Sequence, residues 1–122
     1  KDDLNSILEI IDLCKQYKMV AILEVHDGTG KNEATVLEGI VDYWIEMKNA
    51  LIGNEAYVIL NIANEWYGDW SENDWAEAYI SQIPRLREAG IEIPEDGRQC
   101  RLGAVSYEYC KARCRCVQCR PA

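Results

Sequence analysis

The feature that most constrains this chain is a near-continuous apolar run over residues 58–63, which stops abruptly at the polar pair Asn64 and Glu65. The run opens with Val-Ile-Leu, residue types that favour strands. Because its apolar character is continuous rather than alternating, it predicts a strand covered on both faces, as in a parallel sheet. In such sheets the functional side chains gather at the carboxyl ends of the strands. Glu65 is therefore the first candidate functional residue.

Helical patterns precede and follow this strand. Apolar residues at the i, i+3, i+4, i+7 spacing predict amphipathic helices over residues 2–17, 36–51 and 73–90. Gly53 and Gly90 stand directly after the apolar stripes of the second and third helices and are expected to terminate them. The chain thus alternates between helices and apolar strand-like runs.

A second apolar run, residues 19–25, predicts another buried strand, and it ends at His26. Residues 91–93 are a candidate for the start of a further strand. Helices that alternate with buried strands indicate an α/β fold with right-handed crossovers and a parallel sheet. The pattern alone leaves open whether that sheet is an open doubly wound sheet or a closed barrel.

The residues around Glu65 suggest a sugar-binding site. An amide, Asn64, precedes the carboxyl group, and the aromatic residues Trp66, Tyr67 and Trp70 follow it. Aromatic faces stack on sugar rings, amides bond hydroxyl groups, and a carboxyl group can transfer protons. The alternative reading is an ordinary solvated carboxylate in a loop, with the tryptophans packed in the core.

Three segments resemble one known family. ILNIANEWYGDW resembles the acid/base segment of the endo-β-1,4-mannanases of glycoside hydrolase family 5, a retaining family built on a TIM barrel. VAILEVHDGTG resembles the third barrel strand of these enzymes, and VDYWIEMKNALIG the helix after it. The resemblance covers nearly all of residues 1–94. It implies an α/β fold that is a partial (β/α)8 TIM barrel, from the second helix through the fourth, followed by an irregular tail.

The resemblance also implies roles for individual residues. Glu65 matches the general acid/base, and Asn64 matches the amide that bonds the 2-hydroxyl group of the sugar. His26 matches a residue that lines the cleft at the end of the third strand, although a lone histidine is more often structural. Trp66 and Trp70 are candidate sugar-stacking platforms, with core packing as the alternative.

The family mechanism needs a second carboxylate as nucleophile, which has no counterpart in this chain. We interpret Glu24, Glu72 and Glu77 as ordinary strand, loop and helix acids. The chain alone is therefore expected to be an inactive fragment of an enzyme that hydrolyses β-mannan. The resemblance implies a secreted enzyme that uses no metal and no cofactor, although the sequence contains no signal peptide.

Charge divides the chain into two parts. Residues 1–94 hold 18 acidic and 7 basic side chains, whereas residues 95–122 hold 3 acidic and 6 basic ones. The acidic part could not neutralise phosphates, which argues against a nucleic-acid partner. No apolar run is long enough to span a membrane, so we expect no membrane partner.

Five of the six cysteines lie in residues 95–122, four of them at Cys110, Cys114, Cys116 and Cys119. This grouping permits a zinc or disulfide interpretation, but it contains one C-x2-C pair instead of the two that a zinc site of this kind uses, and no histidine. Read one nucleotide later with permitted codons, residues 96–122 can encode a string that contains GWGQYP and FNADP. That string resembles the fifth strand and following loop of the same mannanases. We therefore interpret residues 95–122 as an out-of-frame tail without a native fold.

Two alternatives to a mannanase fragment stay open. Another family 5 activity, such as that of a cellulase, could use the same strand-end residues, because loops choose the sugar. A non-enzymatic small module with a zinc-stapled or disulfide-bonded tail is the alternative from a different class.

Overall fold

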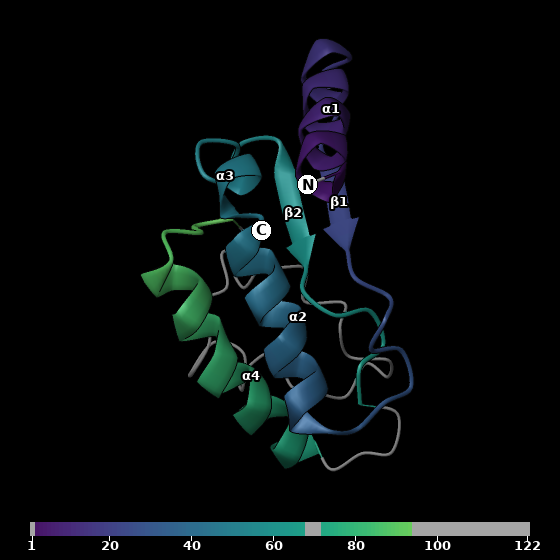
Figure 1. The fold of residues 1–122 in the computed structure, drawn as a ribbon, viewed down its shortest axis with the longest axis vertical. Coiled ribbons are helices and arrows are strands. Elements are labelled where there is room, and N and C mark those ends of the chain that lie inside the picture. The colour runs from purple at the N-terminus through teal and green to yellow at the C-terminus, as the bar shows by residue number, and fades with distance from the viewer. Residues whose placement is uncertain (1, 68–71, 94–122) are drawn as a thin grey trace, which may run out of the picture.

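The computed structural model describes residues 2–67 and 72–93 as an α/β arrangement of helices around a short parallel sheet (Figure 1). The elements in chain order are α1 (Asp2–Gln16), β1 (Ala21–Glu24), α2 (Ala34–Glu46), α3 (Lys48–Leu51), β2 (Val58–Asn61) and α4 (Glu72–Glu88). The predicted alternation of helices and strands is confirmed within the described residues. None of the helices in these two ranges is long and apolar enough to cross a membrane.

The two strands are parallel and pair in a single register. Ala21 lies opposite Val58, and the pairing continues to Glu24 opposite Asn61. Both strands point the same way in Figure 1, so the loops that follow them lie at the same end of the sheet. This arrangement confirms the prediction that the two polar strand ends, which lead to His26 and Glu65, share one edge.

The two strands differ in how much they are covered. Val58 and Leu60 of β2 are almost fully buried, as the apolar run predicted. The prediction of a buried strand over residues 19–25 was wrong for β1, because its Ile22 is 46% exposed and the preceding Val20 is also exposed. The physical reason is coverage of the strand faces: Val58 and Leu60 belong to the core cluster, whereas from β1 only the partly buried Leu23 packs against it.

Helices α2 and α4 lie side by side (Figure 1) and contribute to a core that also includes residues of α1, α3, β2 and the segments after β2 and α4. From α2, Leu37, Val41 and Trp44 are buried, and the Trp44 indole Nε1 donates to the backbone carbonyl of Ile62 at 2.9 Å. This bond ties the middle of the core to the segment that leads from β2 into the site. An ion pair between Arg85 and Asp42 joins the exposed sides of α4 and α2.

The helix ends follow the backbone rules for left-handed caps. Gly90 has a φ of 89°, and the amide of Ile91 donates to the carbonyl of Leu86 at 3.0 Å, as in a Schellman motif. Leu86 and Ile91 are both fully buried, so the cap also packs the chain back onto the core. Gly90 therefore terminates α4 as predicted. The second predicted helix divides at Met47 into α2 and α3 instead of running unbroken to residue 51.

Some sequence expectations fall at or beyond the limits of the described residues. Ile91 and Ile93 are buried, but residues 91–93 are not a strand of the described sheet. Trp70 and the proposed tail, residues 95–122, lie outside the described ranges. Cys14 is free, and no three histidine, cysteine, aspartate or glutamate side chains in the described part of the chain group as a metal site would require.

The Trp44 bond can be tested by replacing Trp44 with phenylalanine. This change leaves the Ile62 carbonyl without its donor and a void beside it, so the free energy of unfolding should fall by about 2–4 kcal/mol. Trp75→Phe is the matched control, since the buried Nε1 of Trp75 has no partner among the described residues and its loss should cost about 1 kcal/mol or less. Urea denaturation measures both variants. Equal losses would contradict the role given to the Trp44 bond.

Candidate functional site

The site is built from two loops, one after each strand, which are joined by hydrogen bonds. The amide of Asn64 donates to the carbonyl of Val25 at 2.8 Å, which continues the strand pairing beyond β1 and β2. Further along, the amide of Gly30 donates to the carbonyl of Glu65 at 3.0 Å, and the Thr29 hydroxyl donates to the carbonyl of Asn64 at 3.0 Å. These bonds hold residues that are 35 positions apart in the sequence at one edge of the sheet.

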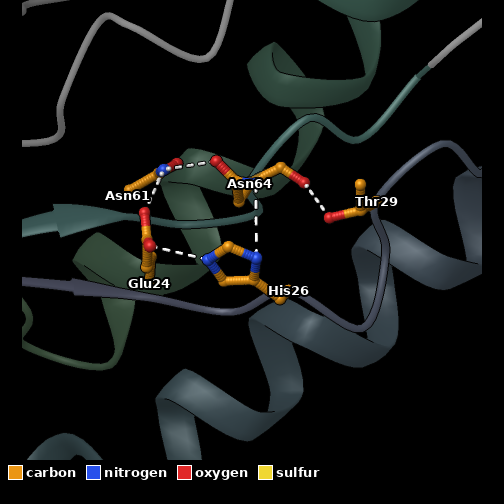
Figure 2. Close-up of polar contacts among 5 residues, drawn as sticks. All are labelled: Glu24, His26, Thr29, Asn61 and Asn64. Atoms are coloured by element: carbon orange, nitrogen blue, oxygen red, sulfur yellow. Dashed lines mark hydrogen bonds and ion pairs between the residues drawn. The ribbon is translucent and has the colours of Figure 1, made fainter.

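Four polar side chains meet at this edge (Figure 2). Glu24 Oε1 lies 2.6 Å from His26 Nε2, and Glu24 Oε2 accepts from Asn61 Nδ2 at 3.1 Å. Asn64 lies beside Asn61 and above His26 in Figure 2, with 3.5 Å contacts to Asn61 and to His26 Nδ1. The contact of Glu24 with Asn61 has an ordinary hydrogen-bond length and that with His26 is short, whereas the 3.5 Å contacts of Asn64 are longer than usual. His26 and Asn64 are thus brought together, as their positions at the two strand ends predicted.

Glu65 occupies an uncommon backbone conformation. Its φ is 49° and that of Tyr67 is 75°, so two of the three residues 65–67 lie in the left-handed region although neither is a glycine. Such residues cost of order 1–3 kcal/mol each and persist where surrounding structure holds them. Here the hydrogen bond from Gly30 and another from the amide of Tyr67 to the carbonyl of Lys31, at 2.7 Å, hold this turn in place. The half-buried Glu65 side chain follows directly after Asn64.

Trp66 does not form the open platform expected for sugar stacking. It is only 2% exposed, lies edge-on to Tyr67 and Tyr79 with ring centroids 5.2 and 5.8 Å away, and donates from Nε1 to the carbonyl of Glu33 at 3.2 Å. A sugar ring needs an accessible aromatic face, so the placement of Trp66 fits the alternative of core packing. Burial in the same cluster raises the pKa of Tyr79 above its usual value. Trp70, the other candidate platform, lies outside the described residues.

Glu24 is the site residue that sequence analysis missed. It was interpreted as an ordinary strand acid, yet it contacts both His26 and Asn61. A signal was present, because residues two positions apart on an extended chain project from the same face, which puts Glu24 beside His26. His26 itself is accessible, with 61% of its side chain exposed. The edge therefore presents a carboxylate, an imidazole and an amide within reach of a bound polar molecule.

Comparison with known proteins agrees with this geometry. The family model described as "Cellulase (glycosyl hydrolase family 5)" matches residues 1–108. The chain belongs to glycosyl hydrolase family 5. The resemblance noted from the strand-end motifs is thereby confirmed, and the family 5 chain can be compared with its curated relatives.

These relatives include mannan endo-1,4-β-mannosidases. The enzyme from Salipaludibacillus agaradhaerens is 58% identical over 91 residues, which make up 75% of this chain and 30% of the relative. The enzyme from Cellvibrio japonicus (strain Ueda107) is 45% identical over 90 residues, 71% of this chain and 21% of the relative. The family 5 chain thus spans less than a third of either relative.

Solved structures with the same fold are also mannanases. A mannohexaose complex of the Thermomonospora fusca β-mannanase superposes with a TM-score of 0.67 at 44% identity, over 75% of this chain and 32% of that one. The catalytic domain of a Streptomyces sp. SirexAA-E mannanase gives a TM-score of 0.68 at 36% identity, over 75% and 30% of the two chains. Both likenesses cover a part of a larger catalytic domain.

The strain at Glu65 predicts an unusual mutational outcome. Glu65→Gly removes the left-handed penalty, so the free energy of unfolding should rise by about 0.5–1 kcal/mol, even though glycine usually destabilises. Glu38→Gly, the same chemical change at an exposed position inside α2, should instead cost about 1 kcal/mol. Urea or thermal denaturation of the two variants gives the comparison. A loss at both positions would show that Glu65 is not strained.

Proposed function

We propose that residues 1–94 are part of the catalytic (β/α)8 barrel of a retaining mannan endo-1,4-β-mannosidase, with Glu65 as its general acid/base. The observation that carries the proposal is the common edge at which two parallel strands place His26, Asn64 and Glu65. The names of the relatives at 58% and 45% identity support mannan as the substrate class. Since mannan is a polymer, we further propose that the intact enzyme is secreted and acts outside the cell.

Each residue has a specific part in the proposed reaction. Glu65 protonates the glycosidic oxygen as the bond to the leaving sugar breaks, and in the second step it removes a proton from the attacking water. Asn64 donates from its amide to the 2-hydroxyl group of the reacting sugar. Its long contacts within the protein leave this amide available, and catalytic hydrogen bonds are often long until substrate binds. His26 lines the cleft beside Asn64.

Retention requires a second carboxylate about 5 Å from the first, to form the glycosyl-enzyme. In the proposed barrel this nucleophile stands on a later strand. The uncovered surface of β1 supports a larger barrel: Val20 and Ile22 are about half exposed, and parallel strands are normally covered on both faces. Additional strands and helices would cover these side chains and pair the open edge of β1.

A chimeric enzyme tests the proposed role of Glu65. Residues 3–93 of this chain replace the aligned segment of the Salipaludibacillus agaradhaerens mannanase, which supplies the rest of the barrel. The chimera should hydrolyse mannan with retention of configuration, and Glu65→Gln should lower its kcat by about 10²–10⁴-fold, because the leaving group loses its acid. Release of reducing sugar and nuclear magnetic resonance of the products measure rate and stereochemistry.

Three controls accompany this measurement. Glu77→Gln changes an exposed acid of α4 and should leave the rate unchanged. Mannan and carboxymethylcellulose are assayed with the chimera and with the unsubstituted Salipaludibacillus agaradhaerens enzyme, and a shift of the chimera toward cellulose would favour the cellulase alternative. The 122-residue chain alone should release no sugar. An active chimera that tolerates Glu65→Gln would overturn the assignment of the acid/base.

We also propose that residues 95–122 are translated out of frame. The support is compositional and comes from the change of charge and cysteine content after residue 94, together with the family-like string that the shifted frame permits. A small module with a zinc-stapled tail is the competing proposal. Under the out-of-frame proposal the cysteines have no bearing on metal binding or on the redox compartment.

The nucleotide sequence decides between these two proposals for the tail. We expect the frame shifted by one nucleotide to encode GWGQYP and FNADP, and purified protein to contain no stoichiometric zinc by atomic absorption. A nucleotide read whose shifted frame lacks both strings would reject the frameshift. Zinc at one equivalent, with loss of structure on chelation, would favour the metal-binding tail instead.

A further inference from the structure

Glu24 closes a ring of four polar contacts that connects the ends of both strands (Figure 2). It is the last residue of β1, and the parallel register sets it opposite Asn61, the last residue of β2. One of its carboxylate oxygens contacts His26 and the other accepts from Asn61. Asn64 completes the ring between Asn61 and His26.

The chemistry of the carboxylate sets the direction of every contact in this ring. A carboxylate only accepts hydrogen bonds, so Asn61 must turn its amide nitrogen toward Glu24. The same nitrogen faces Asn64, which must therefore present its oxygen to Asn61 and its own amide nitrogen to His26. His26 then accepts at Nδ1 and donates from Nε2 to Glu24, which requires the neutral imidazole with its proton on Nε2.

We propose that Glu24 is a positioning residue that fixes both the tautomer of His26 and the amide orientation of Asn64. This proposal rests on the proposed function, in which the Asn64 amide bonds the sugar and His26 lines the cleft. The short contacts of Glu24 hold His26 and Asn61, and these two residues in turn orient Asn64 while their 3.5 Å contacts leave it free to bond substrate. Glu24 touches neither the substrate nor the reacting atoms in this proposal.

Counting donors and acceptors shows why glutamine cannot replace Glu24. The four contacts need four donors and four acceptors, and the carboxylate supplies two of the acceptors. Glutamine supplies one acceptor and one donor. The imidazole is neutral, and Asn61 uses one atom for both of its contacts. In at least one of the four contacts, two donors or two acceptors must then face each other. Glu24→Gln is nearly isosteric, so its effect reports the direction of the hydrogen bonds rather than a change of volume.

The tautomer can be measured directly, since His26 is the single histidine of the chain. In the 122-residue protein labelled with nitrogen-15 histidine, two-bond proton–nitrogen correlation spectra at neutral pH should show a protonated Nε2 and an unprotonated Nδ1. Glu24→Gln replaces the carboxylate 2.6 Å from Nε2 by a neutral amide, so the nitrogen-15 shifts of the His26 ring should move. Glu38→Gln removes the same charge from an exposed position in α2 and should leave the spectrum unchanged.

A second variant keeps the proposal testable if Glu24→Gln fails to fold. Glu24→Asp retains two acceptor oxygens and should preserve the Nε2-protonated tautomer. Two results would overturn the proposal: a proton on Nδ1 in the unsubstituted protein or in Glu24→Asp, or a folded Glu24→Gln protein with unchanged nitrogen-15 shifts of the His26 ring.

Kinetics of the chimeric enzyme separate this proposal from the proposed function. Glu24→Gln should lower kcat by about 10–100-fold with a smaller change in KM, because misplaced groups act mainly on the transition state. Glu24→Asp should recover part of the loss. A chimera inactive even with Glu24 intact, together with the expected change in the His26 nitrogen-15 shifts, would reject the mannanase assignment while Glu24 keeps its place in the ring. An active chimera indifferent to Glu24→Gln would reject the positioning role and leave the mannanase assignment standing.

Discussion

The parallel pairing of β1 with β2 is the constraint on which the rest of this structure depends. Its register sets Glu24 opposite Asn61 and brings the loops after both strands to one edge. A shift by one residue would turn Glu24 and Asn61 to different faces, because side chains alternate along a strand. The ring of polar contacts would then be lost, and the core residues of β2 would leave their neighbours on α2.

Order at this edge comes at a local energetic cost. Two residues without glycine's freedom, Glu65 and Tyr67, take left-handed backbone conformations within one turn. Main-chain hydrogen bonds to Val25, Gly30 and Lys31 offset that cost by joining the turn to the loop after β1. Strain of this kind commonly marks functional sites, where a side chain must be aimed in a direction that relaxed backbone would not give. The family to which the chain belongs is consistent with such a site.

The burial of each helix and strand explains which of the predictions made from the apolar pattern were confirmed. The periodic stripes of α1, α2 and α4 and the apolar run of β2 describe residues that are packed in the described structure, so their patterns match their burial. The run in β1 looks equally apolar, yet part of it is exposed, because burial of a strand depends on neighbours beyond its own sequence. Trp66 fails for the converse reason. An aromatic residue after a strand is compatible with a binding platform or with packing, and contacts with Tyr79 decided for packing.

The sequence by itself determined the kind of fold and which residues are candidates for a site. Apolar periodicity specifies helices and parallel strands, and the abrupt polar ends at His26 and Asn64 mark the candidate edge, since both signals are local. Tertiary structure alone decided how the polar groups pair. Glu24 contacts Asn61, which is 37 residues away, and it also contacts His26, whose other ring nitrogen faces Asn64. The sheet register brings together the atoms that set the direction of each hydrogen bond. The sequence around a carboxylate therefore does not reveal whether it will contact these partners.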